Sequence, residues 1–162
     1  MSVNENTKEM EQKIRNWLLE EGFKITLLSD EHACFNIVAE DTDGRKVNVA
    51  QPIKKKDKIT IATGAILSKE LQQKVITLEA EERNRILWTL RLGLLNRGVG
   101  FSGIEVPLES VEVSTIIYYD SLTKDNFMQR LFEVRKSLLF IFWMVERMLG
   151  EPEPTIEPYY IE

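Results

Sequence analysis

His32 and Cys34 are the two residues whose types could support metal binding or nucleophilic chemistry in this chain. Two positions apart on a strand, an imidazole and a thiolate project to the same face, where they could share a metal ion or act as a nucleophile pair. The chain contains one His and one Cys, so a zinc site would also need carboxylates or a second subunit. We therefore predict two polar strand residues, with no metal site and no catalytic role.

Residues 98–103 read Gly-Val-Gly-Phe-Ser-Gly and match the glycine-rich pattern of dinucleotide-binding loops. Such a loop must follow a strand and lead into a helix, because the helix N-terminus holds the pyrophosphate. Here the apolar pattern places a helix before the loop and a strand after it. We predict a helix C-cap and a loop at these glycines, and no cofactor.

Asp41, Asp43 and Gly44 resemble the middle of a calcium-binding loop. However, Ala39 occupies the position that should supply the first carboxylate, and Ala50 occupies that of the final glutamate. The Asp-Gly pair instead favours a tight hairpin turn, because glycine tolerates positive φ. The sequence therefore predicts a turn between two antiparallel strands at this point.

The formal net charge of −5 argues against nucleic acid as a partner, because phosphate binding needs a concentrated basic face. The basic run at Lys54, Lys55, Lys56 and Lys58 is interpreted as a solvated turn, with contact to an anion or an acidic partner as the alternative. No spacing among the 26 acidic residues singles out a catalytic pair. The sequence also contains no phosphate loop and no HExxH motif, so we predict that the protein is not an enzyme.

Length and composition indicate a cytoplasmic protein that does not bind membranes. The longest uninterrupted apolar run, residues 138–145, is far shorter than the roughly 20 residues that cross a bilayer. Residues 1–12 are polar and charged, unlike a signal peptide. The single cysteine, Cys34, cannot form an internal disulfide, which favours a reducing compartment.

The chain has the length of a single domain, at 162 residues. Regular apolar patterns extend to about residue 150, and they predict one α+β domain over residues 1–150. Residues 151–162 are acidic and contain three prolines. We predict a mobile tail there, which could dock through its few apolar side chains, Ile156, Tyr159, Tyr160 and Ile161.

Apolar periodicity predicts the secondary structure of the first half of the chain. Asn6 and Glu9 form a capping-box pattern, which predicts a helix from Thr7 to Glu21. Period-two alternation then predicts four short strands. Their apolar positions are Ile25 and Leu27; Ala33, Phe35, Ile37 and Ala39; Val47 and Val49; and Ile59 and Ile61.

The second half is predicted to contain two helical regions and two strands. Ser68 opens a helix that reaches Asn96, with a break near Thr77. Strands are expected over residues 101–106 and 111–119, and Thr123 caps a last helix that reaches Leu149. The predicted fold is α+β, in the order α-β-β-β-β-α-β-β-α, with an antiparallel sheet of five to six strands and helices packed mainly on one face.

The last helix carries more apolar surface than one core requires. At 100° per residue, one continuous stripe faces the core, and it consists of Phe127, Leu131, Val134, Leu138, Ile141, Val145 and Met148. Phe140 and Trp143 lie on the opposite line. The helix that reaches Asn96 shows the same property, with Ile86, Leu87, Leu90 and Leu94 on one side and Trp88, Leu92 and Leu95 on the other. These helices could bury each other within one fold, or their second faces could bind a second copy or another protein.

The run Ile117-Tyr118-Tyr119-Asp120 and the following residues 122–128 resemble an uncharacterised archaeal family, domain of unknown function 2299, as do Val134, Arg135, Lys136 and Trp143. The order of elements is similar to that of type III secretion chaperones and YbjN-like proteins. Chaperones of that fold dimerise and bind extended protein segments along sheet and helix surfaces. The resemblance therefore implies a small dimeric binding module, and it supplies no site residues.

Two functional hypotheses follow from the apolar helices. The first is a non-enzymatic, chaperone-like protein-binding module that forms a homodimer, with an unidentified protein as a further partner. Its interface residues would be Trp88, Leu92, Leu95, Phe140 and Trp143. The alternative is a small-molecule or lipid-tail binding protein, in which the aromatic side chains line an apolar pocket between the sheet and the last helix.

Overall fold

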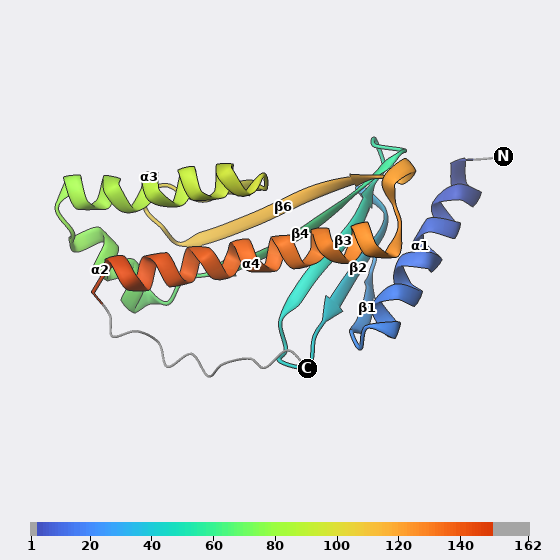
Figure 1. Cartoon of the computed structure of the whole chain (residues 1–162), viewed down its shortest axis with the longest axis horizontal. Helices are drawn as coiled ribbons and strands as arrows, with labels where there is room; N and C mark the ends of the chain where they lie inside the picture. Colours follow the sequence, from blue (N-terminus) through green and yellow to red (C-terminus); the bar gives the residue numbers. More distant parts are fainter. Residues whose placement is uncertain (1–2, 151–162) are drawn as a thin grey trace.

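The computed structural model describes residues 3–150, which form six β-strands and four α-helices (Figure 1). The strands are β1 (Lys24–Leu28), β2 (Ala33–Glu40), β3 (Lys46–Pro52), β4 (Lys58–Ile66), β5 (Gly100–Ser102) and β6 (Ser110–Tyr118). The helices are α1 (Val3–Glu20), α2 (Lys69–Thr77), α3 (Ala80–Arg97) and α4 (Lys124–Met148). Neighbouring strands are antiparallel in one sheet ordered β1-β2-β3-β4-β6-β5, which confirms the predicted fold class. The predicted tail lies outside the described residues.

Helix α1 begins at Val3 rather than at Thr7. Asn6 and Glu9 therefore lie inside the helix, and the predicted capping box is wrong. No proline or glycine occurs before Gly22, so nothing in the sequence stops the helix from extending towards the N-terminus. Gly22 has a φ of 83°, and the chain turns there into β1.

The hairpin between β2 and β3 has the turn that the sequence predicts. Gly44 has a φ of 80°, and the carboxylate of Asp41 accepts hydrogen bonds from the backbone N–H groups of Asp43 and Arg45, both at 2.9 Å. Asp41 also forms an ion pair with Arg135 of α4, and both side chains are largely buried. The hairpin is thereby tied to the last helix.

Residues 68–97 form two helices, and the break falls where it is predicted. The Ser68 hydroxyl caps α2 by accepting a hydrogen bond from the backbone N–H of Leu71 at 3.2 Å. Leu78 is extended, which ends α2, and α3 begins at Ala80 with two glutamates in its first turn. Carboxylates at this position stabilise the helix dipole, so the acidic run explains why a new helix starts here.

Strand β5 is shorter than the predicted strand over residues 101–106. It ends at Ser102, because the next residue, Gly103, has a φ of 83°. A β-carbon on Gly103 would lie 1.9 Å from the carbonyl oxygen of Ser110, so the close approach of this turn to β6 requires glycine.

Helix α4 begins and ends as predicted. A single 3-10 turn, Tyr119–Ser121, connects it to β6 and replaces the last residue of the predicted strand. The Thr123 hydroxyl accepts a hydrogen bond from the backbone N–H of Asn126 at 3.2 Å, which caps the helix. The helix then continues to Met148.

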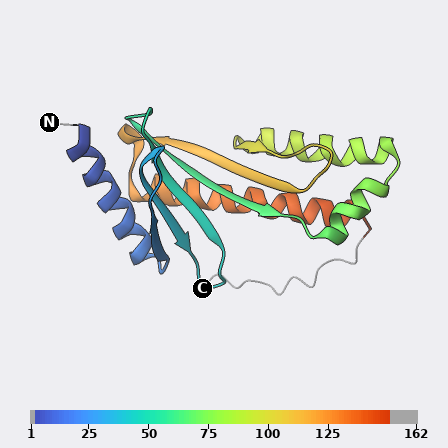
Figure 2. The same ribbon diagram turned by 180° about the vertical axis from the view of Figure 1, so that it is seen from behind.

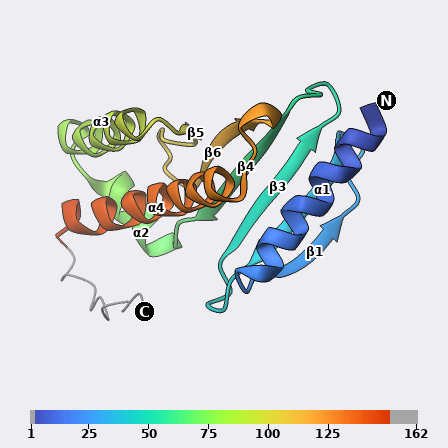
Figure 3. The ribbon, with the colours of Figure 1, turned by 45° about the vertical axis from the view of Figure 1, so that its right-hand side comes forward.

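Helices α1 and α4 cover the same face of the sheet (Figure 3). Helix α1 packs on β1 and β2, and α4 packs on β4 and β6. The hydrophobic core lies between these helices and the inward side chains of the strands. Its fully buried members include Ile14, Leu18, Ile37, Val49, Ile59, Ile61, Val113, Phe127, Leu131, Val134, Ile141 and Val145.

The opposite face of the sheet is not covered by any helix among residues 3–150 (Figure 2). The strand register aligns Val38, Asn48, Ala62 and Ser114 in one row across its centre, and these uncharged side chains are partly exposed. The centre of this face therefore carries no charge across these four strands.

Helices α3 and α4 run antiparallel (Figure 1), and the ring of Phe140 on α4 lies against Gly93 on α3. A β-carbon on Gly93 would lie 2.2 Å from Cζ of Phe140, so the ring occupies the space that any larger residue would need. The Arg97 guanidinium lies 5.1 Å from the centroid of the same ring and 3.7 Å from Glu133 of α4. Glycine in the middle of an apolar helix is explained by this contact.

We expect Gly93→Val to lower the free energy of unfolding by about 1–3 kcal/mol, because its methyl groups would overpack against the Phe140 ring. Phe140→Ala removes the ring, so the double variant should lose less stability than the sum of the two single variants. Denaturant unfolding measures each value. Asn96→Val, an exposed substitution on α3, is the control. If the stability loss of the double variant equals the sum of the losses of the two single variants, the proposed contact between Gly93 and Phe140 is contradicted.

Candidate functional site

Helix α3 exposes three large apolar side chains on the side that faces away from the core. Trp88 is 57% exposed, Leu92 is 58% exposed and Leu95 is 68% exposed. Their spacing of four and then three residues places them in one stripe along the helix. The other apolar side chains of α3 are buried as predicted, and they are Ile86, Leu87, Leu90 and Leu94.

Trp143 of α4 is also exposed, by 43%. The helices are antiparallel and meet at Gly93 and Phe140, so helical periodicity puts Leu92 and Trp143 on the same side of the pair, away from the sheet. We call Trp88, Leu92, Leu95 and Trp143 the outer face. Sequence reasoning grouped Phe140 with these residues, but the structure places Phe140 between the two helices.

Arg91 limits the freedom of Trp88. Its guanidinium lies 5.3 Å from the centroid of the indole ring, and its Nε donates a hydrogen bond to the carbonyl of Ile104 at 3.0 Å. The arginine is therefore anchored at one end, and a cation–π contact holds the exposed ring beside it. A large aromatic side chain that is already ordered loses little entropy on binding, which favours association through this residue.

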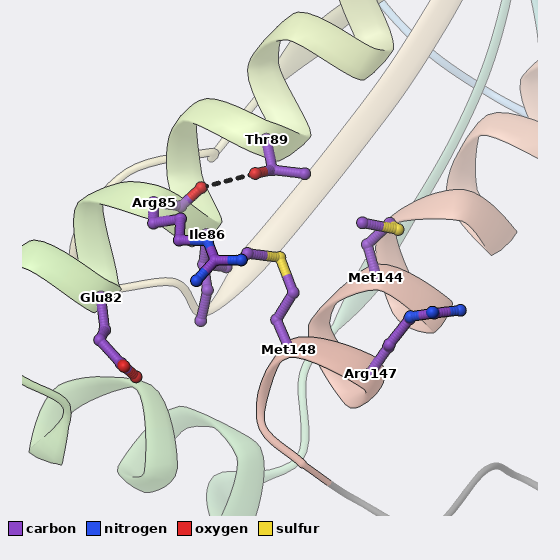
Figure 4. Close-up of a pocket in the computed structure, with 7 residues that line it drawn as sticks. All are labelled: Glu82, Arg85, Ile86, Thr89, Met144, Arg147 and Met148. Carbon is purple, nitrogen blue, oxygen red and sulfur yellow. Dashed lines mark hydrogen bonds between the residues drawn. The ribbon is translucent and has the colours of Figure 1, made fainter.

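A cavity of about 380 Å³ lies between the first half of α3 and the last turns of α4 (Figure 4). It is lined by Glu82, Arg85, Ile86, Thr89, Met144, Arg147 and Met148. The Thr89 hydroxyl donates a hydrogen bond to the carbonyl of Arg85 at 2.7 Å. The lining of the cavity therefore combines two guanidinium groups, one carboxylate and one hydroxyl with three apolar side chains. Sequence analysis missed it, because the two helices that form it are distant in the chain.

His32 and Cys34 do not form a site. His32 lies in the turn before β2 rather than on a strand, which corrects the prediction, while Cys34 is exposed within β2. The carboxylate of Asp30 accepts a hydrogen bond from the backbone N–H of His32 at 2.8 Å, and this bond forms the turn. No group of three or more His, Cys, Asp or Glu side chains suited to a metal ion occurs among residues 3–150.

Within the glycine-rich stretch, Gly98 is the helix C-cap that the sequence predicts, whereas residues 100–102 form strand β5 in place of the predicted loop. Gly98 has a left-handed conformation with a φ of 74°, and its N–H donates to the carbonyl of Leu95 at 3.1 Å. The strand β5 follows at once. No helix N-terminus is present here to hold a pyrophosphate.

Lys54, Lys55 and Lys56 lie in an exposed turn between β3 and β4, as predicted, whereas Lys58 begins strand β4. A buried glutamine supports the turn. Gln51 is almost fully buried, and its amide donates to the carbonyl of Lys55. The amide oxygen of Gln51 accepts a hydrogen bond from the hydroxyl of Tyr119. The two partners are 68 residues apart in sequence, so no local pattern could have predicted this link.

A family model described as an uncharacterized conserved protein (DUF2299) matches residues 10–145. The chain belongs to this family. It is also similar to the crystal structure of an uncharacterized protein from Methanothermobacter thermautotrophicus, with 30% sequence identity and a TM-score of 0.82. That similarity covers 87% of this chain and 99% of the other. No curated protein shows significant similarity to the chain.

The similar crystal structure supports the fold, and neither comparison identifies a functional site. The predicted resemblance to domain of unknown function 2299 is confirmed. None of the helices within residues 3–150 combines the length and the apolar content that crossing a membrane requires.

Burial raises the pKa of Tyr119, and the nearby charges of Cys34 and Asp57 add to this effect, whereas a hydrogen bond with Thr7 lowers it. A raised pKa favours the protonated phenol in the folded state, so its stabilising effect is complete below the ordinary pKa and is lost as the pH rises through the folded value. We expect the stability advantage of wild type over Tyr119→Phe to shrink as the pH rises above about 10. Denaturant unfolding at several pH values measures it. A difference in the free energy of unfolding between wild type and Tyr119→Phe that stays constant above this pH would contradict the raised pKa.

Proposed function

We propose that the protein is a non-enzymatic, chaperone-like binding module that forms a homodimer through its outer face. The observation that carries this proposal is the exposure of Trp88, Leu92 and Leu95 in one stripe. Burying one side chain of this size contributes about 1.5–3 kcal/mol. In a monomer, three such side chains would stay in contact with water on one side of a single helix, and none of this stabilisation would be gained.

A second copy of the chain fits this stripe, because the stripe can pair with itself. In a two-fold symmetric dimer the same patch is used by both copies. An axis near Leu92 would set Trp88 of each copy against Leu95 of the other, since the two residues are spaced evenly about a point next to Leu92. Trp88 would then be buried on either side of the axis, and tryptophan is enriched among the interface residues that dominate binding.

The uncovered face of the sheet would remain free in such a dimer. Its central row of Val38, Asn48, Ala62 and Ser114 carries no charge. An extended segment of another protein could lie on this face, which agrees with the resemblance to secretion chaperones. The exposed single thiol, Cys34, supports a reducing compartment such as the cytoplasm.

Small-molecule binding is the second candidate function, and the cavity between α3 and α4 favours it. Between the sheet and α4, where sequence reasoning placed an apolar, aromatic-lined pocket, lies a smaller cavity of about 190 Å³. Its lining contains no aromatic side chain and consists of Arg45, Lys46, Thr63, Gly64, Arg135 and Leu138. The cavity of about 380 Å³ is within the size range of ligand sites. Native mass spectrometry separates the two functions, since a ligand bound stoichiometrically would favour this candidate and an empty dimer the first.

We expect light scattering of the purified protein at high micromolar concentration to give the mass of a dimer. Trp88→Glu and Leu92→Glu should each weaken the dimer about 30-fold or more, because each would bury a charge in an apolar contact. The matched control is Leu19→Glu on α1, since Leu19 and Leu92 are both 58% exposed.

The control variant should remain a dimer. A wild-type protein that stays strictly monomeric at high micromolar concentration would overturn the proposed homodimer. If Leu19→Glu weakens the dimer as much as Leu92→Glu does, the outer face is not the interface.

A further inference from the structure

The cavity between α3 and α4 contains two arginines without a carboxylate partner among residues 3–150. Neither Arg85 nor Arg147 forms an ion pair or a side-chain hydrogen bond in this part of the chain. Other arginines of these helices are engaged: Arg97 pairs with Glu133, and Arg135 pairs with Asp41. Two guanidinium groups that form no ion pair with residues 3–150 therefore lie beside one cavity.

Three apolar side chains and the hydroxyl of Thr89 line the cavity beside the two arginines. Ile86 of α3 and Met144 and Met148 of α4 line the cavity (Figure 4). The one carboxylate in the lining belongs to Glu82, whose side chain points away from Arg85. Methionine side chains adapt to irregular partners, so this site suits a flexible segment that carries carboxylates and apolar groups together.

Residues 151–162 of the same chain have this composition. They include four glutamates and no lysine, arginine or histidine, and their apolar side chains are Ile156, Tyr159, Tyr160 and Ile161. The segment follows Gly150 directly, and two cavity residues, Arg147 and Met148, lie in the last turn before it. An extended chain covers about 3.3 Å per residue, so the segment is long enough to return over the cavity.

We propose that the cavity between α3 and α4 binds residues 151–162 of the same chain. Glutamate side chains pair with Arg85 and Arg147, and the apolar side chains of the segment cover Ile86, Met144 and Met148. Because the segment is covalently attached, its effective concentration at the cavity is on the order of millimolar, so weak individual contacts suffice. Charge complementarity selects this segment over the rest of the chain.

The test uses the full-length chain and NMR order parameters of the backbone amides in residues 153–162. We expect wild-type values closer to the ~0.85 of a rigid backbone than to the values below ~0.6 of flexible segments. The double variant Arg85→Gln/Arg147→Gln should lower them below ~0.6. Arg130→Gln, the same substitution on α4 about 25 Å from Arg147, should leave them unchanged.

A second variant, Glu153→Gln/Glu157→Gln, leaves the helices untouched and should release the segment in the same way. Order parameters that are low in wild type, or that stay high in both double variants, would overturn the proposal. Order that appears only at high protein concentration would also overturn it, because the segment would then bind a second copy. Light scattering reports the dimer separately, so failure of this proposal is distinguishable from failure of the proposed function.

Discussion

Phe140 of α4 occupies the space beside Gly93 of α3, and the arrangement of the helical layer depends on this contact. Both sides of α3 are apolar, so burial of apolar surface alone would not decide which side faces the core. The missing side chain at Gly93 decides it, since only that face of α3 can approach α4 closely. Leu90 and Leu94 are then buried, and Trp88, Leu92 and Leu95 are turned outward. The outer face is thus a consequence of how the core is packed.

Helix α4 joins this layer to the rest of the domain. Its apolar stripe packs on β4 and β6, and Arg135 pairs with Asp41 at the turn of the β2–β3 hairpin. The same Asp41 carboxylate accepts two backbone hydrogen bonds within that turn. A single helix therefore fixes the sheet on one side and α3 on the other, while the second face of the sheet and the outer face of α3 stay uncovered. The centre of the uncovered sheet face carries no charge, and the outer face is formed by large apolar side chains, so these two surfaces support the proposal of a binding function.

The elements whose signals are local could be predicted from sequence. Alternation located β1 to β4, and side-chain caps located the starts of α2 and α4 at Ser68 and Thr123. The start of α1 was misplaced, because a capping pattern at Asn6 and Glu9 does not end a helix that can extend past it. Phe140 was assigned to an interface because projecting α4 alone cannot show that a glycine on α3 makes room for the ring. The Gln51–Tyr119 link and the cavity beside Arg85 and Arg147 also join distant segments, and no local pattern announces them.

The central claim is that a second copy covers the outer face, and acrylamide quenching of Trp88 tests it most directly. A variant with Trp17→Phe and Trp143→Phe leaves Trp88 as the single tryptophan of the chain. Its indole is 57% exposed in one copy, so quenching should be efficient in dilute solution. The account predicts that the quenching constant falls as the protein concentration rises into the high micromolar range, because association covers the ring. A quenching constant that stays the same over that whole range would contradict it.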